Sequence, residues 1–188
     1  MTVLTHSFMH SDRLNTHIRF LYACGSMYKT VNGNLLFHGC IPLDSNGKLQ
    51  SVNIEGKQYS GKAMLDKLDE IANKAYFVPS GAEKDYAADY LWYLWCGPCS
   101  PLYGKDKMAF FERCFIGDIE LQRENYNDYY RFSEQPEVCG HILEMFGLDP
   151  QRGHIINGHV PVKIKNGESP VRANGRLFVI DGGISKAY

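Results

Sequence analysis

The sequence predicts a mixed α/β fold, of the α/β or α+β class, in a single domain over residues 1–188. Helical and extended patterns are interspersed along the chain, which is typical of a mixed sheet covered by helices. Two short apolar runs, within 154–163 and 177–183, each end in a polar residue beside glycine, as buried strands do at the edge of an open sheet. A hydrophobic content of 44% in 188 residues is enough for one sizeable core.

The first half of the chain carries clear local signals. Residues 11–24 are expected to form a helix that Ser11 caps and Gly25 ends. The pair Asn32-Gly33 predicts a tight turn between strands at 27–31 and 34–37. The other elements expected here are a small hairpin and two helices, at 51–54 with 57–59, at 60–77 and at 82–95.

The second half is expected to contain two further helices before its strands. Residues 106–115 show apolar side chains at helical spacing, so Met108, Phe111 and Phe115 are expected in the core. Residues 133–146 are expected to be helical, with Pro136 in the first turn, where proline is tolerated.

Two histidines, His38 and His159, each follow a predicted strand and stand beside a glycine. Neutral imidazole is the commonest protein ligand of transition metals, so both are candidate metal ligands. The pair Asn157-Gly158 is expected to form a turn that needs positive φ and to hold His159 at its tip. The alternative is a histidine that only forms hydrogen bonds within its turn. His154, five residues earlier, is expected to be structural or at the far end of the strand.

The segment from Trp95 to Cys99 has the same five residues as the redox site of thioredoxins. That chemistry needs a strand before the motif and a helix that starts within it. The residues before Cys96 look helical, so a chance pair of loop thiols is favoured over a thiol oxidoreductase that uses Cys96 and Cys99.

Two lysines, Lys105 and Lys107, lie in a loop that follows Gly104. They are candidates for holding a phosphate group, and the alternative is that both are simply solvated. The segment from Gly117 to Glu120 resembles the opening motif of metallophosphatases, but glutamate replaces its histidine, so these residues are expected at the surface.

Composition argues against several classes of protein. The formal net charge of -1 gives no reason to expect a nucleic-acid or membrane-surface partner. No run approaches the roughly 20 apolar residues of a membrane span, and residues 1–9 lack the features of a signal peptide. Six scattered cysteines fit reduced thiols better than a disulfide framework, so a cytoplasmic location is expected.

Taken together, four segments resemble the class III (Firmicutes-type) fructose-1,6-bisphosphatases of bacteria, and the likeness extends over nearly the whole chain. They are Asn34–Pro42, Tyr93–Met108, His154–Lys163 and Val179–Tyr188. The resemblance implies the calcineurin-like metallophosphatase fold, a β-sandwich flanked by helices. It also implies hydrolysis of the 1-phosphate of fructose 1,6-bisphosphate, a step of gluconeogenesis, with a pair of Mn²⁺ ions. By the match of motifs, His38 and His159 would be metal ligands, and Asp181 and Gly182 would line the site.

Three motifs from which that superfamily builds its metal site, Asp-x-His, Gly-Asp-x-x-Asp-Arg-Gly and Gly-Asn-His-Glu, do not occur in the sequence. The chain is therefore expected to be a C-terminal portion of the catalytic region, without the N-terminal metal-binding half. Alone it is expected to bind Mn²⁺ weakly, to hydrolyse the bisphosphate negligibly, and to self-associate or pair with the missing half. The alternative is a non-catalytic remnant of the same scaffold that binds sugar phosphates or regulates.

Overall fold

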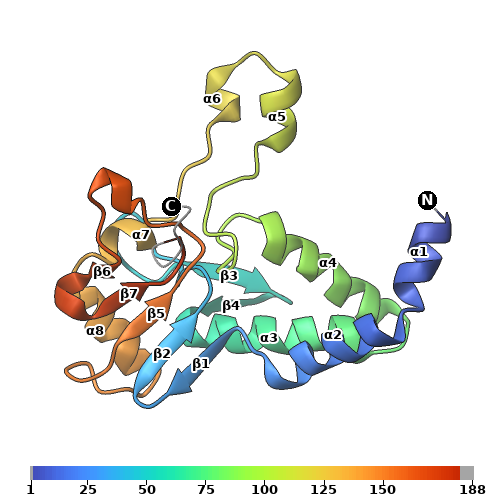
Figure 1. Cartoon of the computed structure of the whole chain (residues 1–188), viewed down its shortest axis with the longest axis horizontal. Coiled ribbons are helices and arrows are strands. Elements are labelled where there is room, and N and C mark those ends of the chain that lie inside the picture. Colours follow the sequence, from blue (N-terminus) through green and yellow to red (C-terminus); the bar gives the residue numbers. More distant parts are fainter. Residues whose placement is uncertain (1, 183–188) are drawn as a thin grey trace.

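The computed structural model describes residues 2–182 and has the expected mixed α/β architecture (Figure 1). Its main sheet has five strands in the order β1-β2-β5-β7-β6. Their bounds are β1 Tyr28–Val31, β2 Asn34–Phe37, β5 Ile155–Asn157, β6 Val171–Arg172 and β7 Leu177–Val179. The hairpin of β3 (Ser51–Ile54) and β4 (Lys57–Ser60) is separate. The described residues thus form one five-stranded sheet and a separate hairpin. They do not include the predicted sandwich of two large sheets.

The centre of the main sheet is parallel, and its edges are antiparallel. Strand β2 runs parallel to β5, and β5 runs parallel to β7, whereas β1 and β6 pair antiparallel at the two edges. The β1–β2 turn is the one that the sequence predicts, because Asn32 and Gly33 both adopt positive φ, at 51° and 77°. Parallel neighbours place their carboxyl ends at one edge, and this edge carries both candidate histidines.

Eight α-helices lie within residues 2–182. Their bounds are α1 Thr2–Met9, α2 Asp12–Cys24, α3 Gly61–Phe77, α4 Ala82–Cys96, α5 Phe110–Phe115, α6 Ile119–Gln122, α7 Tyr129–Phe132 and α8 Pro136–Met145. Two short 3-10 helices, η1 Ile164–Asn166 and η2 Ala173–Gly175, flank β6. None of the helices in the described part is long and apolar enough to cross a membrane.

Two clusters of buried side chains form the core. The first joins the sheet to α8 through Leu35, Ile155, Leu177 and Leu143. The second lies between α3 and α4, where the amphipathic face of α3 packs against Ala87 and Leu94 of α4. The helix predicted at 60–77 therefore forms and buries the apolar face that its spacing indicates.

The prediction for residues 106–115 was wrong in extent and in burial. Only Phe110–Phe115 are α-helical, and with α6 they form an arm that projects from the rest of the molecule (Figure 1). Phe111 and Phe115 are 71% and 81% exposed, so neither belongs to the core. The apolar spacing of this helix is typical of a buried one, but the described chain leaves both phenylalanine side chains exposed. Gly117–Glu120 are exposed, as expected.

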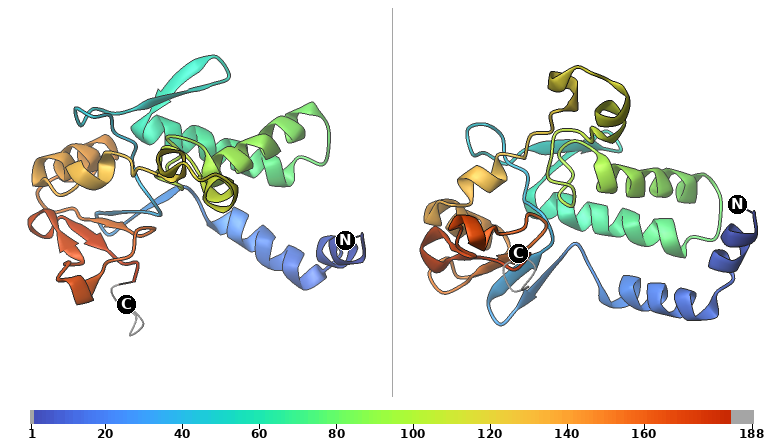
Figure 2. Two further views of the ribbon diagram at one scale, coloured as in Figure 1. Left: turned by 90° about the horizontal axis from the view of Figure 1, so that it is seen from above. Right: turned by 45° about the horizontal axis from the view of Figure 1, so that its top comes forward.

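Helix α2 begins and ends as predicted, since Ser11 accepts a hydrogen bond from the amide of Leu14 and Gly25 is the carboxyl-terminal cap. None of its thirteen described residues is buried. Figure 2 shows α2 lying apart from the layer of α3 and α4. Its side chains are nevertheless partly covered, because Tyr22 stacks on Tyr76 of α3 with 4.7 Å between the ring centroids, while Leu21 is exposed.

Candidate functional site

The two candidate histidines meet at the carboxyl edge of the parallel strands. His38 directly follows β2, and His159 stands two residues past the end of β5. The register of these strands pairs Leu35 with Ile155 and Leu36 with Ile156, so the chain leaves both at the same level. Nε2 of His38 lies 3.1 Å from Nδ1 of His159, although the residues are 121 positions apart. The structure therefore brings the two candidate histidines together, and their role as metal ligands stays a prediction.

A main-chain carbonyl group fixes the orientation of the His159 ring. The Nε2 atom of His159 lies 2.7 Å from the carbonyl oxygen of Tyr103, which can only accept, so Nε2 carries the proton and donates. Nδ1 is then the unprotonated nitrogen, and its lone pair points toward His38. Metal-binding histidines are commonly held in this way by a hydrogen bond on the other ring nitrogen.

The turn that carries His159 differs from the one expected. Asn157 is the last residue of β5 and is buried, and His159 itself adopts the left-handed conformation, with φ of 70°. A positive φ is uncommon for a residue with a side chain and marks a position that the surrounding structure constrains. The prediction that Asn157-Gly158 supplies the positive φ was therefore wrong.

Burial and the neighbouring imidazole both keep His38 neutral. Partial burial of the ring lowers its pKa, and the proximity of His159 lowers it further. Asp181 acts in the opposite direction, with a smaller effect. The net shift is downward, so the His38 ring stays neutral over a wider pH range than an exposed histidine does. Because Nδ1 of His159 can only accept, the single proton of neutral His38 lies on Nε2 and is donated to it, and a bound metal ion would replace this proton.

The pair fits the donor set of a transition-metal ion. Metal–nitrogen distances of about 2.0–2.1 Å place two ligands of one ion roughly 3 Å apart, close to the 3.1 Å between Nε2 of His38 and Nδ1 of His159. Among residues 2–182, no cluster of three or more histidine, cysteine or acidic side chains has the spacing of a metal site. The described residues thus offer two converging nitrogen donors.

Asp181 and Gly182 lie next to this pair, because β7 pairs with β5 and both strands end at the same edge. The amide of Val162 donates to the carbonyl oxygen of Asp181 over 3.0 Å, which ties the segment after His159 to the segment after β7. Gly182 has φ of 73°, and an added Cβ would lie 3.0 Å from Cβ of Pro161. Their predicted roles as lining residues stay predictions. Gly183, which belongs to the same motif, lies outside the described residues.

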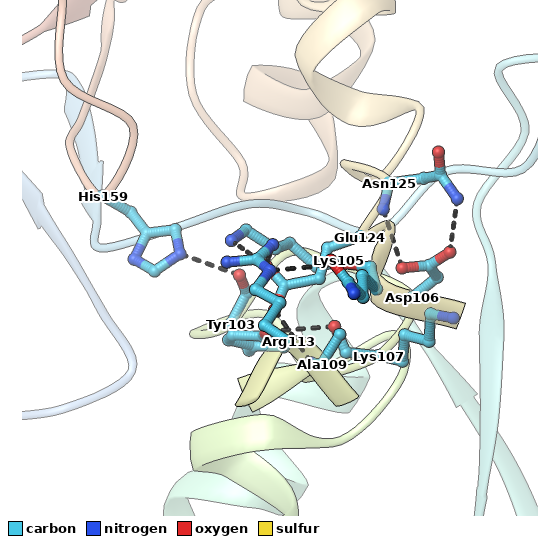
Figure 3. Close-up of polar contacts among 10 residues, drawn as sticks. Tyr103, Lys105, Asp106, Lys107, Ala109, Arg113, Glu124, Asn125 and His159 are labelled. Carbon is cyan, nitrogen blue, oxygen red and sulfur yellow. Dashed lines mark hydrogen bonds and ion pairs between the residues drawn. The ribbon is translucent and has the colours of Figure 1, made fainter. Parts of the chain in front are cut away.

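Both loop lysines have partners in the protein (Figure 3). The Lys105 ammonium lies 2.7 Å from Oε2 of Glu124, and Nζ of Lys107 donates to the carbonyl oxygen of Leu121 over 2.9 Å. A phosphate-binding role for either lysine stays a prediction. Each lysine would then have to bind the phosphate group in addition to its present partner. The hydroxyl group of Tyr103 donates to the carbonyl oxygen of Lys107 over 3.0 Å, so the loop that holds His159 is also the base of the α5–α6 arm.

An apolar cavity of about 900 Å³ opens beside the histidine pair. His38 and His159 line it together with side chains from α2, β1, β2, α3 and α4, including Leu21, Phe37 and Trp95. This cavity could not be predicted from the sequence, because its walls come from segments far apart in the chain.

The cysteine motif has a different setting from that of a thioredoxin. Helix α4 runs up to Cys96, as expected from the residues before it, and Cys99 has φ of 60°. Burial raises the pKa of the Cys99 thiol, whereas redox-active pairs depend on a lowered one. All six cysteines are free thiols in the described part of the chain.

Comparison with known proteins gives a consistent result. The sequence profile of a family described as Firmicute fructose-1,6-bisphosphatase matches residues 1–188. A fructose-1,6-bisphosphatase class 3 of Clostridium botulinum (strain Alaska E43 / Type E3) is 54% identical over 186 residues, and that of Clostridium tetani is 53% identical over 186 residues. Each match covers 98% of this chain and 28% of the relative. No solved structure matches the chain.

The chain therefore spans about 28% of the length of these curated relatives. Because the family profile covers it from end to end, the chain belongs to the Firmicute, or class 3, fructose-1,6-bisphosphatase family.

Proposed function

We propose that this chain contributes part of the active site of a metal-dependent phosphatase that removes the 1-phosphate of fructose 1,6-bisphosphate. In this proposal His38 and His159 are ligands of one Mn²⁺ ion. The observation that carries it is the approach of Nε2 of His38 to Nδ1 of His159, at 3.1 Å, with the other nitrogen of His159 bonded to a main-chain carbonyl group.

Bound divalent ions in such sites lower the pKa of a coordinated water and stabilise charge on the phosphoryl oxygens. The residues of this chain prepare the site for them. The carbonyl oxygen of Tyr103 keeps the proton of His159 on Nε2, and partial burial keeps His38 neutral. Asp181 adds negative charge nearby, which favours a cation at this edge of the sheet.

We infer that residues 1–188 form a single domain within a larger catalytic region, as a C-terminal portion of it. Two nitrogen donors are fewer than the three protein ligands of a typical catalytic metal site. The further ligands would come from the parts of the relatives that this chain does not match. Alone, the chain is expected to bind Mn²⁺ weakly and to hydrolyse fructose 1,6-bisphosphate negligibly, while its exposed apolar surfaces favour contact with the missing half or with a second copy.

The test is an assay of phosphate release from fructose 1,6-bisphosphate with Mn²⁺. The chain is measured alone and after co-expression with the segments that a class 3 relative has in addition. We expect activity only in the combination, and we expect His159→Ala to abolish it. His154→Ala is the matched control, since His154 lies at the other end of β5, bonded to Asn34.

Two results would overturn this proposal. The first is robust turnover by the chain alone that His159→Ala abolishes, because the two histidines would then not be part of a divided site. The second is binding of fructose 1,6-bisphosphate without turnover in any combination, which would favour the non-catalytic, sugar-phosphate-binding alternative.

A further inference from the structure

We propose that Asn157 is a positioning residue that sets the distance between His38 and His159. Its side chain extends the hydrogen bonding between the two parallel strands beyond the point at which each strand ends. This inference rests on the proposed function only where it concerns metal binding, because the geometric part concerns the metal-free pair.

Consecutive residues on one loop hold consecutive carbonyl groups on the other. The amide N–H of Gly158 donates to the carbonyl oxygen of His38 over 2.9 Å. The side-chain Nδ2 of Asn157 donates to the carbonyl oxygen of Gly39 over 3.0 Å. The main-chain ladder between β2 and β5 stops at the strand ends, so these two bonds alone connect the peptide groups around His38 with those before His159 in the described structure.

The Asn157 amide is itself held in one orientation. Its Nδ2 also lies 3.1 Å from the hydroxyl group of Tyr129, a side chain that is completely buried. Because the carbonyl oxygen of Gly39 can only accept, the nitrogen of the amide must face it. Asn157 is 3% exposed, so water cannot easily replace either partner.

The oxygen of the same amide group lacks such a partner in the described part of the chain. Oδ1 of Asn157 is buried and has no hydrogen-bond partner within residues 2–182. Asn157 lines a cavity of about 10 Å³ together with Tyr130, Ser133 and Arg172. A buried amide that is only half satisfied is costly in a core, so an asparagine here contributes less to stability than to geometry.

A purely structural role predicts something else. A buried asparagine that merely fills space would, when replaced by leucine, leave the histidine rings where they are. A positioning role predicts that the Gly39 carbonyl, freed from Nδ2, lets the His38 loop move, so that the two rings separate while the sheet stays intact.

The experiment is nuclear magnetic resonance of the whole chain and of three variants. The wild type should show a nuclear Overhauser effect between the rings of His38 and His159, whose centroids are 4.9 Å apart. Asn157→Leu should lose it while the resonances of α3 and α4 stay unchanged. Asn34→Leu is the matched control, because Asn34 holds His154 at the opposite end of the same strands; this variant should keep the effect. Tyr129→Phe, which leaves the Asn157–Gly39 bond in place, should also keep it.

Titration with Mn²⁺ gives a second readout. Selective broadening of the His38 and His159 signals should need about 10- to 100-fold more Mn²⁺ in Asn157→Leu than in the wild type, the range seen when outer-shell partners are lost. If the wild type shows no selective broadening, the metal-binding role fails, but the ring contact still decides the role of Asn157. An unchanged ring contact in a folded Asn157→Leu would overturn the positioning role.

If Asn157→Leu does not fold, a measurement on the wild type decides. The side-chain amide protons of Asn157 should exchange slowly with solvent and should show a nuclear Overhauser effect to the α-protons of Gly39. Rapid exchange without that contact would overturn the proposal.

Discussion

Nε2 of His38 lies 3.1 Å from Nδ1 of His159, and each ring has a different support. His159 donates from its other nitrogen to Tyr103, while the peptide group of His38 is held by the amide of Gly158. The ring of His159 and the peptide group of His38 are thus each held by a main-chain group, and such rigidity suits metal ligands. The position of the ring pair between a rigid sheet edge and the loop of Tyr103 leads to the first two predictions.

The left-handed backbone of His159 separates the effect of its side chain from that of its conformation. With φ of 70°, His159→Ala leaves a Cβ in an unfavourable region, whereas His159→Gly does not. We expect His159→Gly to be more stable than His159→Ala by about 1 kcal/mol, while both lose the response to Mn²⁺. Urea unfolding of the two variants measures the difference. Equal unfolding free energies would show that the position is not held at positive φ.

Gly39 is expected to tolerate no side chain. A Cβ at this position would lie 2.4 Å from the carbonyl oxygen of Pro101 and 3.0 Å from that of Leu102, both in the main chain. The amide of Cys40 already donates to Pro101 over 2.8 Å, so the two loops cannot separate without losing that bond. Gly39→Ala should lower the free energy of unfolding by about 2 kcal/mol, within the range for overpacked sites.

Gly117→Ala is the control for Gly39→Ala. Nothing lies within 4 Å of a Cβ added at Gly117. Its effect should stay within about 0.5 kcal/mol of zero, as for most surface changes. Similar losses in both variants would mean that the effect comes from glycine flexibility and not from the contact with Pro101.

Much of the fold could be predicted because its signals are local. The cap at Ser11, the Asn32-Gly33 turn and the amphipathic pattern of residues 60–77 each depend on neighbours in the sequence. The candidate histidines followed from the same logic, as both stand just after an apolar strand. Their mutual distance did not follow, because it depends on the parallel pairing of β2 with β5 across more than a hundred residues.

Three features could not be predicted correctly from the sequence. The partner of His159 is a main-chain carbonyl group, and every residue has one, so Tyr103 could not be singled out. Asparagine and glycine adopt positive φ most readily, so the sequence predicts it at Asn157-Gly158. In the structure His159 adopts it instead, because tertiary contacts constrain this residue. The exposed arm at 110–122 has the apolar spacing of a core helix, and spacing alone does not show whether another layer covers it.

The third prediction concerns Glu124, which anchors the α5–α6 arm. Its side chain is only 8% exposed and lies 2.7 Å from Nζ of Lys105 and 3.3 Å from a guanidinium nitrogen of Arg113. It also accepts from the amide of Ala109 over 2.9 Å, where the arm begins. Burial alone would raise the pKa of Glu124, but the bonds from Lys105 and Ala109 and the charges of Lys105 and Arg113 outweigh it, so the net pKa is lowered.

Because the folded-state pKa of Glu124 is lowered, its stabilising effect is complete above the ordinary glutamate value and is lost as the pH falls through the lowered value. We expect Glu124→Gln to reduce the stability of the arm by about 1–2 kcal/mol at neutral pH, and the difference from wild type to shrink on acidification. Hydrogen exchange of residues 109–124 measures this. Glu120→Gln, at an exposed carboxylate of the same arm, should have little effect at any pH. A difference between Glu124→Gln and wild type that stays constant down to acidic pH would contradict the assigned charge.

The fourth prediction is self-association through exposed apolar side chains. Phe111 and Phe115 on the arm are 71% and 81% exposed, and α2 buries none of its apolar residues within the described chain. Large exposed apolar patches are uncommon on a monomer and usually mark a contact. We expect light scattering to show an average mass above the 21.4 kDa of one chain at high concentration. Replacing both phenylalanines by serine should lower that mass while changing the unfolding free energy little, since neither side chain is buried. Lys57→Ser, an exposed change on the β3–β4 hairpin, should leave the mass unchanged. A monomer at every concentration would mean that these surfaces remain exposed to water in the isolated chain, and a mass that the double replacement does not lower would point to the α2 face as the contact.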